Sequence, residues 1–181
     1  NACRSPRILA SIMIGGATEL IRAVTLLHAA PHHTVLIADR VLTRSVLEHC
    51  GRALWLLDPT IDARTRVARG LIEQLEDLRL QKLLLGAHDD LARGFQESIE
   101  EITRRATAAG FKVRHNRKRP STVDRETRPG SSAAVTLSTG SESIGQLAQR
   151  SLSLAVHGNP ISTLMHRDPD ADLLELGGGL V

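Results

Sequence analysis

Apolar residues recur at helical spacing along most of the first 110 residues of the chain. The pattern predicts four helices, at residues 7–30, 34–57, 61–86 and 89–109. Pro31 ends the first helix, Thr60 is a typical N-cap for the third, and Gly110 is a typical C′ glycine for the fourth. Because the connections are short, neighbouring helices are expected to be antiparallel.

The pattern changes after this helical region. From Lys112 to Ser143 the chain is polar, rich in Ser, Thr, Arg and Pro, and without strand-like alternation. A loop of this length is either functional or disordered. A fifth helix is predicted from Ser143, which fits a capping box with Gln146, to Gly158, and a short sixth helix over 160–167.

These elements predict an all-α fold, an antiparallel bundle of about five helices with a long polar loop before the last long helix. The single bundle domain is assigned to residues 1–111 and 143–168, the polar basic loop or arm to 112–142, and a C-terminal tail to 169–181. Hydrophobic residues make up 41% of the chain and aromatic residues only 2%, so aliphatic side chains must fill the core. The scarcity of aromatics argues against a stacking platform for single-stranded nucleic acid.

Charge and cysteine usage narrow the class of protein. The formal net charge is +3, and nearly all of the 23 basic residues are Arg. This excess reflects either a GC-rich coding sequence or a preference for bidentate phosphate contacts. Cys3 and Cys50 have no metal or redox spacing, so a reducing, cytoplasmic location is expected.

The first predicted helix also resembles a signal peptide, with basic residues before an apolar run. Glu19 and Arg22 follow that run and lead into another, as in a packed amphipathic helix, so no leader and no membrane contact is expected. Pro31 separates His28 from His32, and the chain has no phosphate-binding glycine loop or EF-hand loop. Neither a metal nor a cofactor is therefore expected.

A basic cluster begins the polar segment. The residues predicted to contact nucleic acid are Lys112, Arg114, Arg117, Lys118 and Arg119. The cluster is either a solvated linker or an arm that attracts phosphate groups.

The stretch "QRSLSLAVHGNP", residues 149–160, contains the candidate catalytic couple Arg150 and His157. On a helix these residues lie about 20° apart in azimuth and roughly 10 Å apart in rise. This separation suits two groups that reach one phosphate, with Arg as clamp and His as proton carrier. Ser151 and Ser153 are the supporting residues beside them. The alternative is a solvent-facing Arg and a His that caps the helix end.

Arg150 to His157 also resembles the R-x(4–6)-H signature of the HEPN superfamily. The stretches "RSVLEHCGRALWLLDP", "RVARG" and "LSLAVHGNP" add to the resemblance, which covers residues 34–85 and 143–165. It implies a helical homodimer in which Arg150 and His157 of two subunits meet in one cleft and promote attack of a ribose 2′-hydroxyl on the adjacent phosphate. Active members often have Asn, Asp or His after the Arg, where this chain has Ser151.

Arg44, Glu48 and Arg52 form a second polar stripe, at i, i+4 and i+8 of the second predicted helix. The stripe is either a surface ion ladder or a partly buried network. A network could orient His157 or line a cleft.

Two functions follow from these patterns. The first is an HEPN-like metal-independent ribonuclease or RNA-binding domain, of the kind found in toxin or phage-defence systems, acting as a homodimer. The second is a non-catalytic helical regulatory module that binds a partner protein. The residues leave open whether the protein is an enzyme.

Overall fold

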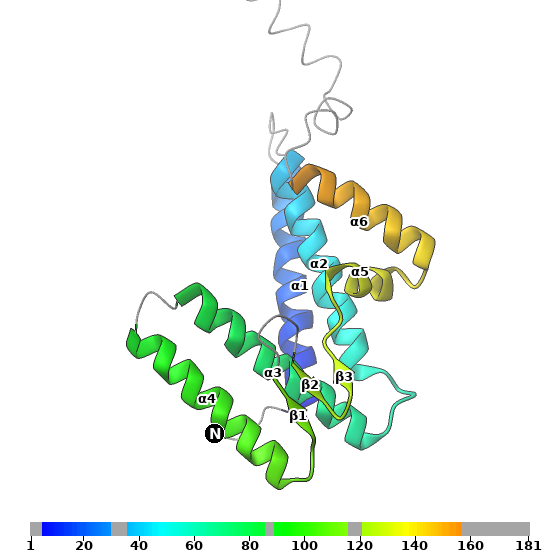
Figure 1. The fold of residues 1–181 in the computed structure, drawn as a ribbon. Helices are drawn as coiled ribbons and strands as arrows, with labels where there is room; N and C mark the ends of the chain where they lie inside the picture. Colours follow the sequence, from blue (N-terminus) through cyan, green and yellow to red (C-terminus); the bar gives the residue numbers. More distant parts are fainter. Residues whose placement is uncertain (1–4, 30–35, 86–88, 116–120, 157–181) are drawn as a thin grey trace, which may run out of the picture. The chain divides into compact units, whose positions relative to one another are not determined.

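The computed structural model describes residues 5–29, 36–85, 89–115 and 121–156, most of which are helical (Figure 1). The helices are α1 (Pro6–Ala29), α2 (Leu36–Leu57), α3 (Ala63–Leu85), α4 (Asp89–Ala108), α5 (Ser131–Thr139) and α6 (Glu142–Val156). The strands are β1 (Val113–Arg114), β2 (Thr122–Val123) and β3 (Glu126–Thr127). The predicted all-α class is confirmed, and the five longer predicted helices end within a few residues of their expected limits. The predicted sixth helix lies outside the described residues.

The chain divides into two compact units. The first unit comprises residues 1–14 and 52–130, and the second comprises residues 15–51 and 131–181. The division falls within α1 and within α2, so each of these helices contributes residues to both units.

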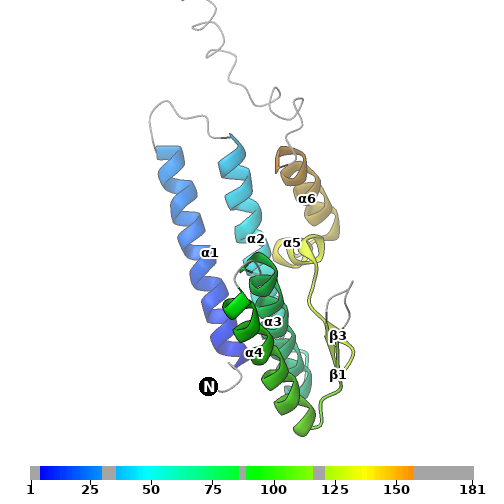
Figure 2. The same cartoon turned by 60° about the vertical axis from the view of Figure 1, so that its left-hand side comes forward.

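The first unit is built on the pair α3 and α4, which lie side by side (Figures 1 and 2). The three strands form an antiparallel sheet in the order β1-β2-β3, with β2 and β3 in contact with α3. Aliphatic side chains dominate the core, as the composition predicted. Its buried members are Leu9, Ala10, Met13, Ala53, Trp55, Leu56, Ala68, Leu71, Ile72, Leu75, Ala106 and Val123.

A Schellman motif leads from α4 into the sheet. Gly110 has a φ of 82°, its N–H donates to the Thr107 carbonyl at 2.9 Å, and the Phe111 N–H donates to the Ala106 carbonyl at 3.0 Å. A left-handed residue at this position is strained unless it is glycine. The predicted C′ role of Gly110 is therefore confirmed.

Residues 112–142 were expected to be a polar loop, and this expectation is wrong for the described part of the segment, which contains the sheet and α5. The strands pair for only two residues each, too short for a period-two pattern to appear. They are joined by a two-residue turn at Asp124 and Arg125, with φ values of 51° and 76°. Such turns usually contain Gly or Asn. Asp124 holds the turn by accepting the Lys112 N–H at 2.8 Å and Arg64 Nε at 2.7 Å.

Two predicted helix caps are shifted by two residues. The third predicted helix is capped by Asp62, whose carboxylate accepts the Thr65 N–H at 2.6 Å, because the Thr60 N–H and hydroxyl both donate to Asp58. The last helix is capped by Ser141, whose hydroxyl accepts the Ile144 N–H at 3.5 Å, in place of the predicted Ser143.

The second unit contains a close approach of α5 to α2. A Cβ added at Gly51 of α2 would lie 1.8 Å from the carbonyl oxygen of Ala134 in α5. α6 in turn packs on α5, where Gly145 faces Thr136. Ala134 and Val135 are fully buried, and the short helix α5 contacts both α2 and α6.

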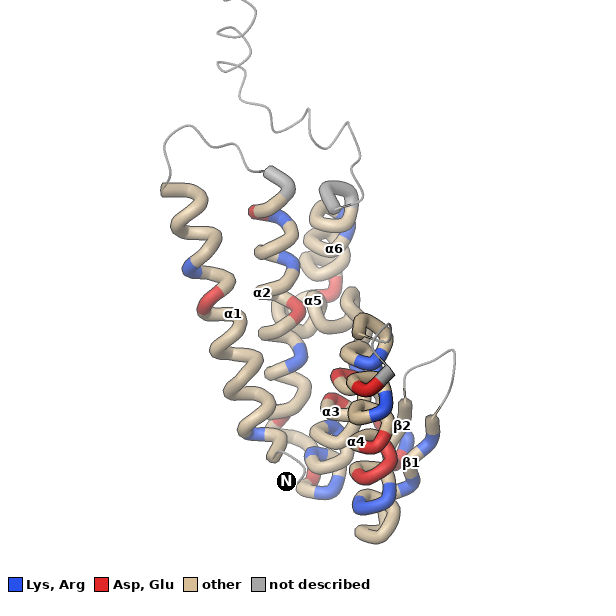
Figure 3. The backbone as a smooth tube through the Cα atoms, turned by 90° about the vertical axis from the view of Figure 1, so that its left-hand side faces the viewer, with Lys and Arg blue, Asp and Glu red and all other residues tan. Residues whose placement is uncertain are grey.

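α1 is long and apolar enough to cross a membrane by length and composition alone, and only 11% of its most apolar window is buried. Figure 3 shows few charged residues on α1 and many on α3 and α4. Core helices of soluble proteins, which are mostly buried, and N-terminal signal sequences have the same length and composition, so these two properties alone assign α1 no membrane role.

Candidate nucleic-acid interface

α6 presents one member of the candidate couple. Arg150 and Ser151 are exposed, whereas Gly145 of the same helix is buried against α5. Ser153 is half-buried and accepts a hydrogen bond from Gln149 Nε2 at 3.2 Å. His157 lies outside the described residues, so the separation of the couple stays a prediction.

Arg44 and Glu48 form a partly buried network in the second unit. Arg44 Nε lies 2.9 Å from Glu48 Oε1, and Arg44 Nη2 donates to the Ser131 hydroxyl at 2.9 Å. The Ser131 hydroxyl in turn donates to Glu48. Both charged side chains are about four-fifths buried, so the pair is not a solvated surface ladder. It connects α2 to the first residue of α5.

Arg52 belongs to the first unit, and its electrostatic partner there is Glu73 of α3. Burial raises the pKa of Glu73 above its usual value, and the positive charges of Arg128 and Arg52 partly oppose that rise. Arg128 is the direct ion-pair partner of Glu73, at 2.8 Å. The predicted stripe of Arg44, Glu48 and Arg52 is thus divided between two polar clusters.

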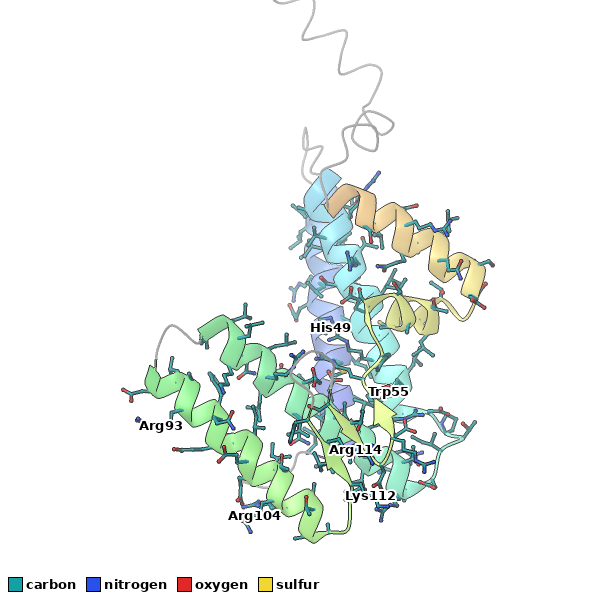
Figure 4. The ribbon with its side chains drawn as sticks, in the orientation of Figure 1. His49, Trp55, Arg93, Arg104, Lys112 and Arg114 are labelled. Atoms are coloured by element: carbon teal, nitrogen blue, oxygen red, sulfur yellow. The ribbon has the colours of Figure 1, made fainter. Side chains whose placement is uncertain are left out.

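The described part of the basic cluster lies at β1, which Lys112 precedes and Arg114 ends. Val113 packs against the core of the first unit, and Lys112 and Arg114 are both exposed (Figure 4). Successive strand residues point to opposite faces of a sheet, so the alternation directs the two cations away from the core. The Lys112 N–H and the Arg64 guanidinium hold the pKa of Asp124 below its usual value. This contact fixes the backbone that leads into β1.

The other members of the predicted basic cluster, Arg117, Lys118 and Arg119, lie outside the described residues. Among the described residues, no group of three or more His, Cys, Asp or Glu side chains could hold a metal ion.

A groove with a cavity volume of about 790 Å³ lies between α3, α4 and β1. None of its lining residues is among the predicted site residues. Arg79 and Lys82 lie one turn apart on α3, and Arg104 projects from α4 (Figure 4). The i, i+3 spacing of Arg79 and Lys82 was the one signal available in the sequence, but such pairs are common on surface helices.

Comparisons with known proteins assign the chain to no family. No protein-family model, no curated protein and no solved structure matches the chain.

Proposed function

We propose that the protein binds RNA through Lys112, Arg114 and Arg150, and that Arg150 and His157 cleave the bound strand without a metal ion. The proposal rests on the resemblance of residues 150–157 to the R-x(4–6)-H signature. Lys118 and its two neighbouring arginines, outside the described residues, extend the proposed RNA contact in the sequence.

The observation that carries the proposal is that two arginine side chains are exposed and lack a protein partner among the described residues. Arg114 and Arg150 are both exposed, and neither forms an ion pair or a side-chain hydrogen bond with another described residue. Arg44, in contrast, is partly buried and forms an ion pair with Glu48. A guanidinium without such a partner keeps all five N–H donors, and two of them can bind two oxygens of one phosphate.

In the proposed reaction Arg150 binds the non-bridging oxygens of a phosphate, where negative charge develops in the transition state. His157 accepts the proton of the ribose 2′-hydroxyl as that oxygen attacks phosphorus. The bond from phosphorus to the 5′-oxygen breaks, and this oxygen takes up a proton from water. The products are a 2′,3′-cyclic phosphate and a free 5′-hydroxyl.

The proposed active form is a homodimer, in which Arg150 and His157 of the two subunits meet in one cleft. What supports self-association is the apolar surface of α6, where Ile144 is 57% exposed and Leu147 is 67% exposed. The molar mass in solution, measured by light scattering, should be twice that of the chain. The double variant Ile144→Ser, Leu147→Ser should have the mass of a monomer.

Cleavage of a labelled RNA in the presence of a chelator tests the mechanism. We expect Arg150→Ala and His157→Ala each to slow cleavage by about 10²-fold or more, because a positioned acid or base contributes about 10²–10⁴-fold. Arg93→Ala is the matched control, because Arg93 is an exposed arginine on α4 whose ion-pair partner is Asp90. Undiminished cleavage by His157→Ala would exclude the mechanism, and failure of the protein to bind RNA would exclude the whole proposal.

The second candidate is a non-catalytic module that binds a partner protein. The exposed Ile144 and Leu147 favour it as well, because apolar side chains on one helix face are typical of protein interfaces. It predicts no RNA turnover and full retention of partner binding when Arg150 and His157 are both replaced by Ala. Turnover that disappears in this double variant would eliminate the second candidate.

A further inference from the structure

The groove of the first unit is built from three elements. α3 and α4 form its walls, and the end of β1 and the residue before β2 close one side. Its lining residues are Leu75, Arg79, Lys82, Gln96, Ile99, Glu100, Thr103, Arg104, His115 and Ser121. The volume of about 790 Å³ falls in the range of about 300–1,000 Å³ that is usual for small-molecule sites.

The groove has an apolar part in which Ile99 is the half-buried member. Leu75 also lines the groove but is only 1% exposed, and Ile99 packs against the core to which Leu75 belongs. This packing fixes Ile99, so a ligand that covers the Ile99 side chain displaces water from a preformed apolar surface.

Arg79 is oriented by a buried carboxylate. Glu76 has a side chain only 3% exposed, and its Oε1 accepts the Ser121 N–H at 2.8 Å. Its Oε2 accepts Arg79 Nε at 3.0 Å. The terminal Nη groups of Arg79 form no hydrogen bond with any described residue. The guanidinium is therefore held at one edge and keeps its outer donors for a ligand.

Lys82 lies one turn further along α3 and adds a second cation. Its Nζ donates to Gln96 Oε1 at 2.8 Å, and Gln96 Nε2 donates to Glu100 Oε1 at 2.7 Å. An ammonium group has three donors, so two remain on Lys82. Arg104 also lines the groove, but it already binds Glu101 through two nitrogens. Arg79 and Lys82 thus define the cationic end.

The closed side of the groove is a hydrogen-bonded wall. The Thr103 hydroxyl donates its proton to the Ile99 carbonyl at 2.7 Å, so its contact with His115 Nε2 at 2.9 Å requires an N–H on that nitrogen. In the neutral ring Nδ1 is then an acceptor, and the Ser121 hydroxyl donates to it at 3.2 Å. Both nitrogens of His115 are occupied, which fixes the ring as part of the wall.

We infer that this groove binds a small amphipathic anion, with a planar or aliphatic body on Ile99 and a phosphate or carboxylate group on Arg79 and Lys82. The charged groups around the cationic end are the Glu76 carboxylate, which is buried behind Arg79, and Glu100, which accepts a hydrogen bond from Gln96. The site shares no residue with the proposed RNA contacts, so it goes beyond the proposed function and stands or falls independently of it.

The inference is tested by titrating the full chain with matched probes and measuring heat. 1-Naphthyl phosphate and 1-naphthoate each combine a planar ring with one anionic group, a phosphate in the first and a carboxylate in the second. 1-Naphthol has the ring without the strong negative charge, and inorganic phosphate has the charge without the ring. We expect at least one naphthyl anion to bind at least tenfold more tightly than 1-naphthol and inorganic phosphate. Comparison of the two anions distinguishes a phosphate ligand from a carboxylate ligand.

Two variants and one control locate the binding. Lys82→Ala should weaken binding of the preferred anion at least tenfold, and Arg79→Lys should weaken it as well, because a lysine lacks the planar fork. Arg93→Ala should leave the affinity unchanged. Absence of binding by the folded wild-type chain would overturn the inference. So would equal affinity for 1-naphthol, or binding that neither variant changes.

Discussion

Replacing Arg69 by Ala is expected to lower the unfolding free energy of the first unit by about 3 kcal/mol. The Arg69 side chain is only 12% exposed, and it donates to Glu126 Oε2 at 2.9 Å and to the Trp55 carbonyl at 2.7 Å. Its guanidinium also lies 5.2 Å from the centroid of the Trp55 ring. Arg69 thus connects α2, α3 and β3.

The magnitude follows from these contacts. A hydrogen bond from a charged donor contributes about 1.5–3 kcal/mol, and a cation–π contact adds roughly 0.5–1 kcal/mol at accessible sites. Breaking a fully buried ion pair costs about 3–5 kcal/mol. Because Glu126 is about one-third exposed, water partly replaces its lost partner, and the total stays at the lower end of that range.

Urea denaturation followed by tryptophan fluorescence measures this loss. Trp55 is the only tryptophan of the chain and is buried in the first unit, so its emission reports the unfolding of that unit. Circular dichroism provides a second probe, since Arg69 touches the fluorophore. Arg104→Ala is the control. The Arg104 guanidinium also binds a carboxylate, that of Glu101, but its side chain is 70% exposed, so its removal should lower the unfolding free energy by about 0–1 kcal/mol. Equal losses in the two variants would show that the burial of Arg69 does not strengthen its contacts.

Four further predictions concern the backbone and the response to acid. Arg125→Gly should stabilise the first unit by about 0.5–1 kcal/mol in the same denaturation, because glycine adopts a positive φ without strain. Gly51→Ala should destabilise the second unit by more than about 2 kcal/mol in thermal unfolding, since its Cβ would collide with the Ala134 carbonyl. Gly94→Ala, with open space around the new methyl group, should instead stabilise its helix by about 0.5–1 kcal/mol. The pKa of Asp124 is lowered from its usual value of 3.8, so its contribution to folding stability is present above pH 3.8 and is lost as the pH falls below that value. Asp124→Asn should therefore make the folding stability less dependent on pH in this acidic range.

The long helices could be predicted from the sequence because each has an apolar face that repeats over many turns. α5 could not, because Ser131–Thr139 is short and rich in Ser and Thr, which favour a helix only weakly. Its position depends on the missing side chain of Gly51, a contact between residues far apart in the chain. The sheet was missed for a similar reason, since its turn is held by Arg64 from α3.

The candidate site was predictable only in part. Two of the three members of the polar stripe are partners, because Arg44 and Glu48 have i, i+4 spacing on one helix. The sequence could not show that Ser131 completes this network or that Arg52 faces Glu73, since both depend on tertiary contacts. The groove could not be predicted for the same reason, since the carboxylate that orients Arg79 is itself held by a tertiary contact, from the Ser121 N–H to Glu76.

The salt dependence of RNA affinity tests the central proposal most directly. The logarithm of the binding constant of the wild-type chain for a single-stranded RNA should fall linearly with the logarithm of the salt concentration, with a slope of about −0.7 per neutralised phosphate. The double variant Lys112→Ala, Arg114→Ala should bind more weakly, with a slope smaller by about 1.4. Arg93→Ala should keep the wild-type slope. A double variant that keeps both the wild-type affinity and its slope, or a wild-type chain that binds no RNA at low salt, would contradict the account.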